Sequence, residues 1–244
     1  MKKVSTSVSC NSNLHMKKNQ SDDKVPRVSK TQTTHRECEE NRIITAAPHK
    51  AFFGDSTLQS IVIQPEVTEI GDYAFYGCSN LKSVKFNHCN QLFRIGSHAF
   101  SQCKSLESIT LPDCVEIMQV GAFKGCKSLN AISISENSHL MEIGAFSFED
   151  CYSLISIIIP KRVSIIHKST FYNCASLISI IIPESVQKIE RYAFFHKGSV
   201  QQLTIEGTDV DIDDMTFYDI PNSSIEYSGK KSLSYYSFVN TSAD

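Results

Sequence analysis

The sequence lacks the features that mark several large classes of protein. It contains no run of about 18 apolar residues, so no segment is predicted to span a bilayer. The charged start, Met1-Lys-Lys, is followed by the polar segment 4–10 rather than by an apolar stretch of about 7–15 residues. A secretory signal is therefore not predicted, and on this evidence alone a cytoplasmic location is favoured.

Motifs of catalysis and cofactor binding are also missing. The eight histidines form no HExxH, and the chain has no CxxC, GxxxxGK[ST], GxGxxG or GxSxG. We therefore expect no enzyme, no cofactor and no metal site. The segment 209–214 is dense in aspartate but lacks the glycine and glutamate of a calcium loop. A degenerate turn is the favoured interpretation of this segment, with a calcium site as the alternative.

What the sequence does contain is a repeat. Its anchor phenylalanines recur every 23 or 25 residues: Phe75, Phe100, Phe123, Phe148, Phe171, Phe194 and Phe217. A cysteine follows the first five of them by three residues: Cys78, Cys103, Cys126, Cys151 and Cys174. A fixed period in this range is typical of a repeat protein, whose units bury their apolar faces only by stacking on their neighbours.

Each repeat also carries a strand pattern. Apolar residues stand nine and eleven positions after the anchor phenylalanine, as in Ile180 and Ile182, and this spacing places them on one face of a strand. Prolines such as Pro160 and Pro183 follow the strand, where the loss of an N–H group does little harm. The 25-residue repeats place their two extra residues after the strand, so we expect the register of the core to be kept.

The full pattern can be written IGxxAFxxCxxLxxIxIPxxVxxI, as segments 70–78 and 154–160 illustrate. It resembles the BspA-type leucine-rich repeat family over about residues 47–238. The resemblance implies a leucine-rich-repeat solenoid, a right-handed curved stack that is mostly parallel β with short helical or 3₁₀ corners at each AFxxC. It also implies a non-enzymatic protein-binding or cell-adhesion module, a surface antigen that presents a concave parallel sheet at the cell surface. An intracellular scaffold or regulatory protein that uses the same face is the alternative.

The composition divides the chain into three parts. Residues 1–46 contain no Phe, Tyr or repeat position, and eight basic residues stand against two acidic ones between positions 1 and 36. Such a segment cannot bury enough apolar surface to order itself, so we predict a polar, basic, disordered tail. Residues 47–228 are predicted to form a solenoid of about eight turns, and residues 229–244 a degenerate C-terminal cap.

The repeated cysteines are predicted to be reduced. Five of the nine cysteines occupy one position of the repeat, so their side chains should point in parallel from successive turns. A disulfide needs Cβ atoms that face each other, which parallel side chains do not provide. We therefore expect a column of packed thiols inside the stack.

The candidate binding site is the outer face of the predicted sheet. Alternation along each strand sends positions eight and ten outward, and position eight is mostly serine. Position ten is occupied by Lys85, Thr110, Ser133, Ile158, Ile181 and Thr204. Together with Ile155 and Ile178 at position seven, Ile158 and Ile181 predict an exposed apolar patch, a feature that tends to mark contacts. Strand propensity of β-branched residues is the alternative explanation.

The predicted partner of this face is a protein. Side-by-side self-association is a second possibility, because the row of small residues with branched neighbours is flat. The eight candidate residues of this face are Lys85, Thr110, Ser133, Ile155, Ile158, Ile178, Ile181 and Thr204. They include no cationic or aromatic cluster, so a nucleic acid is not expected and the identity of the ligand stays open.

Overall fold

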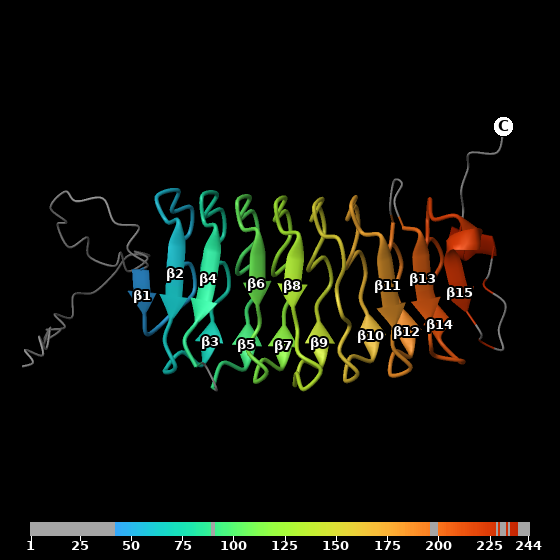
Figure 1. Ribbon diagram of the computed structural model, residues 1–244, viewed down its shortest axis with the longest axis horizontal. Coiled ribbons are helices and arrows are strands. Elements are labelled where there is room, and N and C mark those ends of the chain that lie inside the picture. Colours follow the sequence, from blue (N-terminus) through green and yellow to red (C-terminus); the bar gives the residue numbers. More distant parts are fainter. Residues whose placement is uncertain are drawn as a thin grey trace, which may run out of the picture.

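The computed structural model describes residues 42–88, 91–195, 200–227, 229, 233 and 235–238. The chain winds as a parallel β-solenoid of about eight turns, which stack in one row (Figure 1). Helix is almost absent: the described residues form two short 3₁₀ segments, η1 (Asn222–Ser224) and η2 (Tyr235–Phe238). No helix in these ranges is long and apolar enough to cross a membrane. The predicted stacking of repeats is thus confirmed.

The longer strands of the turns lie side by side and form what we term the strand face (Figure 1). They are β1 (Arg42–Ile44), β2 (Ser60–Ile63), β4 (Ser83–Phe86), β6 (Ser108–Thr110), β8 (Ala131–Ser133), β11 (Ser179–Ile182), β13 (Gln202–Ile205) and β15 (Ile225–Tyr227). All pairs are parallel and join equivalent repeat positions, as Ser179 with Gln202 and Ile181 with Thr204 show. Residues that share a repeat position therefore form straight rows across the face.

A second, narrower sheet precedes each anchor phenylalanine. Its two-residue strands are β3 (Glu69–Ile70), β5 (Arg94–Ile95), β7 (Ile117–Met118), β9 (Glu142–Ile143), β10 (Ile165–Ile166), β12 (Lys188–Ile189) and β14 (Asp211–Ile212). They pair in the orders β3-β5-β7-β9 and β10-β12-β14. One residue of each strand points into the core, and the other lies at the surface.

The strand face is interrupted after β4 and after β8. The paired groups are β1-β2-β4, β6-β8 and β11-β13-β15. Between β8 and β11 the segment 155–159 is joined to β8 by a single bridge, from Ala131 to Ser156. Both interruptions follow the strands of the 25-residue repeats, where two extra residues enter the loop. The insertions leave the core register intact but interrupt the hydrogen-bonded ladder.

The anchor phenylalanines form the centre of the core. All seven are buried, and Phe52 extends the same column upstream. From Phe52 to Phe217 the ring centroids of neighbours are 5.0 to 5.9 Å apart, with interplanar angles of 3° to 20°. Phe238, from η2, tilts by 33° against Phe217 and ends the column. Stacked rings at this separation are favourable beyond the area that they bury.

The corner around each anchor phenylalanine consists of successive turns. In the turn of Phe75 the Ala74 amide donates to the Gly71 carbonyl at 3.1 Å, a 3₁₀-type bond. Tyr73 and Gly77, two residues before and two after the phenylalanine, have φ of 57° and 71°. A left-handed residue cannot continue a right-handed helix, so the expected helical corners take the form of turns with 3₁₀-type bonds. In the turn of Phe123 the same two places are glycines, Gly121 and Gly125.

The corner also joins each turn to the next one. The amides of Tyr73, Phe75 and Gly77 donate to the carbonyls of Ser97, Ala99 and Ser101 at 2.9, 2.7 and 2.8 Å. The same three positions repeat this pattern in later turns, for example Phe148 to the Thr170 carbonyl at 2.9 Å. These bonds form a third ladder, on the side of the stack where the two sheets do not reach.

The solenoid begins before residue 47. Strand β1 lies inside the segment 1–46 that the sequence assigned to the tail, and Ile44 pairs with the core residue Ile63. It escaped prediction because no anchor phenylalanine precedes it. The remainder of the tail, residues 1–41, lies outside the described residues, as does most of the segment 229–244. For both of these parts the division stays a prediction.

Candidate protein-binding face

The structure brings the residues predicted at position ten into one row on the strand face. The pairs Val62–Lys85, Thr110–Ser133 and Ile181–Thr204 are matched by strand register. Their side chains point away from the core: Lys85, Thr110, Ser133, Ile158 and Ile181 are exposed, and Thr204 is half-buried. The binding role of this row stays a prediction, but its common position on one surface is now a structural fact.

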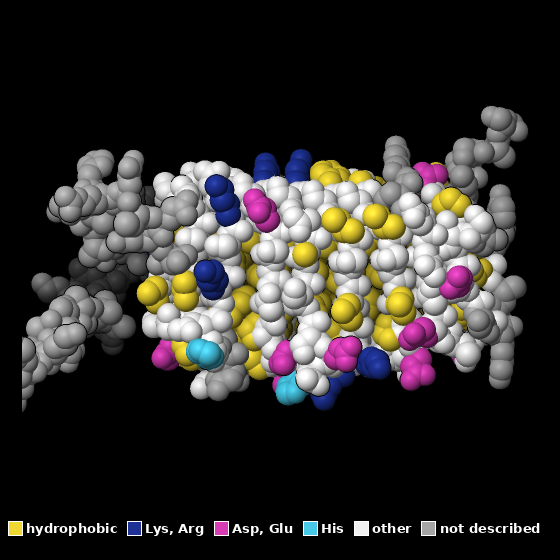
Figure 2. All heavy atoms as spheres, in the orientation of Figure 1, with side chains coloured by type: hydrophobic (Ala, Val, Ile, Leu, Met, Phe, Trp, Pro, Cys, Tyr) yellow, Lys and Arg dark blue, Asp and Glu magenta, His cyan; other side chains and the backbone are white. Residues whose placement is uncertain are grey.

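Four isoleucines of this face form an exposed apolar group, the isoleucine patch. Ile155, Ile158, Ile178 and Ile181 are 48%, 60%, 42% and 58% exposed. Figure 2 shows hydrophobic side chains gathered over this part of the face. The Ile178 amide donates to the Ile155 carbonyl at 3.1 Å, which holds the two turns of the patch together. Leaving four large aliphatic side chains half in water is unfavourable unless another surface covers them.

The patch lies within a neutral strip of four turns. We define this strip by the outward residues at positions seven, eight and ten: Asn130, Ala131, Ser133, Ile155, Ser156, Ile158, Ile178, Ser179, Ile181, Gln201, Gln202 and Thr204. None of these twelve is charged. On the C-terminal side of the strip Glu226 accepts hydrogen bonds from Gln202 and Thr204 at 3.4 and 3.2 Å.

A further exposed isoleucine lies at the N-terminal end of the face. Ile43, on β1, is 67% exposed and pairs with Val62. Sequence reasoning missed it because β1 was assigned to the tail. The available signal was the pair of β-branched residues Ile43 and Ile44, which correspond to Val62 and Ile63 of β2.

The interruption between β4 and β6 opens a groove of about 640 Å³. It is lined by Ser83, Val84, Lys85, Phe86, His88, Ser108, Ile109, Thr110, Leu111 and Pro112. The lining includes buried core residues such as Ile109 and the exposed cation of Lys85. Its lining thus combines apolar and polar side chains without a carboxylate.

The repeated cysteines are buried and form no disulfide, as predicted. Each thiol donates to the carbonyl of the anchor phenylalanine of the preceding turn: Cys78 to Phe52, Cys103 to Phe75, Cys126 to Phe100, Cys151 to Phe123 and Cys174 to Phe148, at 3.0 to 3.2 Å. Burial raises the pKa of Cys78 to about 12 and that of the other four well above the ordinary value of 9.0. The thiols therefore stay protonated at neutral pH and act as packing groups and hydrogen-bond donors.

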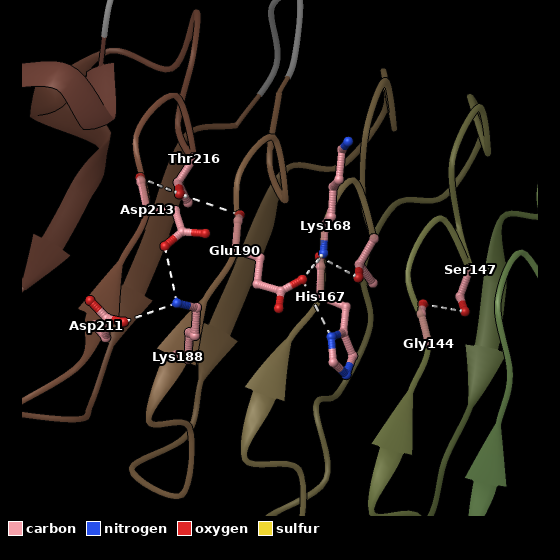
Figure 3. Close-up of polar contacts among 10 residues, drawn as sticks. Gly144, Ser147, His167, Lys168, Lys188, Glu190, Asp211, Asp213 and Thr216 are labelled. Atoms are coloured by element: carbon pink, nitrogen blue, oxygen red, sulfur yellow. Dashed lines mark hydrogen bonds and ion pairs between the residues drawn. The ribbon is translucent and has the colours of Figure 1, made fainter.

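The acidic segment 209–214 is held by a lysine. Lys188 Nζ lies 3.0 Å from Asp211 Oδ2 and 3.2 Å from Asp213 Oδ1 (Figure 3). Hydrogen bonds from Lys188 to Asp211 and Asp213 raise the pKa of the lysine. These two aspartates, considered from sequence for calcium, thus pair with a cation of the protein itself. Across the described ranges no three His, Cys, Asp or Glu side chains are grouped to hold a metal ion.

A similar contact crosses the neighbouring turn. Glu190 Oε2 accepts a hydrogen bond from the Lys168 amide at 2.8 Å and lies 3.4 Å from His167 Nδ1 (Figure 3). Such contacts join consecutive turns at equivalent repeat positions. They fix the register of the stack and lie away from the strand face.

Comparison with known families agrees with this architecture. A model of the BspA type leucine rich repeat region, in six copies, matches residues 45–164 and 141–243. The chain belongs to the BspA-type leucine-rich repeat family. Repeats of this class are generally protein-binding modules.

A solved structure of a leucine-rich repeat protein shows the same fold. A leucine-rich repeat protein from T. pallidum is 24% identical, with a TM-score of 0.56, and the match covers 73% of this chain and 72% of that one. A leucine-rich repeat protein from Bacteroides ovatus is 21% identical, with a TM-score of 0.48, over 71% of this chain and 56% of that one. A comparison with curated protein sequences returned no match.

Proposed function

We propose that this BspA-type repeat protein is a non-enzymatic binding module that presents its strand face to a protein ligand. The observation that supports it most is the isoleucine patch, whose four side chains remain about half exposed beside a fully formed core. Covering them gains roughly 25 cal/mol for each Å² of apolar surface removed from water. A protein surface of matching shape provides that cover.

The buried thiols support a role without catalysis. Their pKa values are raised, so they are poor nucleophiles at neutral pH. On the strand face the exposed side chains of the neutral strip are amides, hydroxyls and aliphatic groups, with no base beside a hydroxyl. Such a surface suits recognition rather than bond breaking.

Adhesion to a protein or to matrix material at the cell surface is the first form of this proposal, because it follows from the family resemblance. An intracellular scaffold or regulatory protein is the second form. The buried thiols of the repeat are compatible with it, since such a fold needs no oxidising compartment. Localisation of a tagged full-length copy separates the two: labelling on intact cells favours the first, and signal confined to the cytosol the second.

Arginine substitutions across the face test the proposal. We expect Ser108→Arg with Ser179→Arg to place two bulky cations on the strand face without disturbing the core, since both serines are exposed. Immobilised full-length chain should capture a ligand from surface or cytosolic extracts, and the double variant should retain at least about tenfold less of it. Purified ligand, titrated by calorimetry, should show the same loss.

Ser164→Arg provides the matched control. Ser164 is exposed but precedes β10 in the second sheet, so it carries the same substitution away from the strand face. It should bind like the unmodified chain. Equal capture by the face variant and by this control would overturn the proposal.

A further inference from the structure

We infer that the isoleucine patch binds a second copy of this chain, with the two strand faces opposed and the two stacks antiparallel. This inference rests on the proposal that the strand face is the binding surface, and it names the partner. The relation between the copies is a twofold axis parallel to the strands, placed between the turn of Ile158 and the turn of Ile181.

The patch is complementary to itself under this axis. The rotation reverses the order of the turns but keeps each residue at its position along the strand. Ile155 therefore meets Ile178 of the second copy, and Ile158 meets Ile181 of the second copy. All four isoleucines of each copy find an apolar partner, as required when two half-exposed patches bury each other.

Small residues between the isoleucines allow close approach. Ser156 and Ser179, at position eight, face each other across the same axis and are both exposed. Opposed sheets pack about 10 Å apart when the residues between them interdigitate. A large or charged side chain at position eight would hold the sheets apart at the axis, and both turns of the patch have serine there.

The neutrality of the strip favours a second copy over a charged partner. Near a twofold axis a charged residue lies close to its own equivalent and is repelled by it, so a surface without charge favours self-contact there. Beyond the isoleucines, Asn130 faces Gln201 of the second copy and Ser133 faces Thr204 of the second copy. None of these residues is charged, so no like charges oppose each other. An acidic or basic ligand would find no complementary group here.

The size of the strip predicts weak association. Four residues along the strand and four turns across it give about 13 Å by 19 Å, or about 250 Å² per copy. Stable specific complexes bury about 800 Å² per partner. The dimer should therefore form with a dissociation constant between about 100 µM and 1 mM. It becomes populated where copies are concentrated.

Sedimentation equilibrium of the purified full-length chain between about 10 µM and 1 mM tests the contact. The molar mass should rise with concentration for the unmodified chain and stay monomeric for Ile158→Ser with Ile181→Ser. Ile43→Ser is the matched control, because Ile43 occupies the same row, is 67% exposed and lies outside the patch. It should associate like the unmodified chain. Far-ultraviolet circular dichroism confirms folding. A monomer at 1 mM, or association that survives loss of both isoleucines, would overturn the inference.

A charge pair tests the predicted geometry. Ser133 and Thr204 lie three turns apart in one copy, about 14 Å, but face each other across the axis. Ser133→Glu with Thr204→Lys should dimerise about threefold to thirtyfold more tightly than Ser133→Lys with Thr204→Lys, since each interface contains two such pairs. Both variants carry Thr204→Lys, so any contact between the introduced lysine and Glu226 is the same in both. Equal affinity, or the reverse order, would exclude the antiparallel arrangement.

The two proposals fail in different experiments. If the purified chain does not self-associate but the Arg-substituted variant still loses its ligand, only the inference of a second copy is refuted. Ligand capture that ignores the face variant refutes the binding face as a whole.

Discussion

A single anchor phenylalanine contributes to stability in two ways. Its ring is buried between the rings of the neighbouring turns, and its carbonyl accepts the thiol of a later cysteine, as Phe123 does from Cys151 at 3.2 Å. Burial of the ring could be predicted from the repeat period alone, because residues that recur at a fixed period occupy equivalent core positions in successive turns. The thiol hydrogen bond could not, since it depends on the distance between two turns that have no fixed sequence signal.

Substitution of the central ring should destabilise the protein far more than substitution of the terminal one. Phe148→Ala removes a buried ring that stacks on Phe123 and Phe171, and we expect a loss of about 3–5 kcal/mol in the free energy of unfolding. Phe52 is partly buried and stacks on Phe75 alone in the described residues, so Phe52→Ala should cost about 1–2 kcal/mol. Urea unfolding of both variants measures these free energies. Equal losses of stability would contradict the difference between a ring stacked on both sides and a ring stacked on one side.

At the scale of elements, the loops determine where the strand face is continuous. The positions of the extra residues after β4 and β8 were visible in the sequence, and so were the strands themselves. The interruption of the ladder was not, because pairing depends on how the longer loop places the next strand. The left-handed corner residues were equally hidden: Tyr73 and Phe146 have φ of 57° and 61°, although bulky residues rarely adopt this conformation.

Amide exchange should detect the interruption between β4 and β6. The Asn130 amide donates to the Glu107 carbonyl at 2.9 Å, which ties β8 to β6. The Glu107 amide occupies the equivalent repeat position one turn earlier, where Lys82 is its counterpart in the preceding turn. It lies between β4 and β6, which are not paired. We expect Glu107 to exchange at least about tenfold faster than Asn130, because exchange follows local opening. Nuclear magnetic resonance resolves both amides; equal protection would show that the ladder is continuous.

At the scale of the whole molecule, about eight turns share one dry interior. The architecture and the rows of the strand face could be predicted because both follow from a period that recurs in every central turn. The ligand could not, since Ser, Thr and Ile at positions eight and ten carry no chemistry specific to one class of molecule. The exposure of the isoleucine patch could be predicted as well, because strand alternation separates Ile158 from Ile157 and Ile159, and the structure shows Ile158 exposed between these two buried residues.

The column of thiols should make the whole protein sensitive to alkali. A buried thiol stays protonated in the folded chain, whereas in the unfolded chain it loses its proton above its ordinary pKa of 9.0. Stability is therefore unaffected below about pH 9 and falls as the pH rises further, by about 1.4 kcal/mol per pH unit for each thiol. Cys126→Ala should reduce this slope by one such increment. Urea unfolding between about pH 8 and 10.5 measures it, and an unchanged slope would contradict burial of the thiol.

The ladder at the corners has an electrical consequence. In each turn the amides that cross to the next one point toward the C-terminal end, and the carbonyls that receive them point back toward the N-terminal end. In the two sheets the bonds between turns run the other way, as the Gly96 amide donates to the Ile70 carbonyl at 2.8 Å and the Gln201 amide to the Ile178 carbonyl at 2.8 Å. The peptide dipoles of the corner side and of the sheet side therefore oppose each other, and the stack has a weaker axial dipole than an α-helix of the same length.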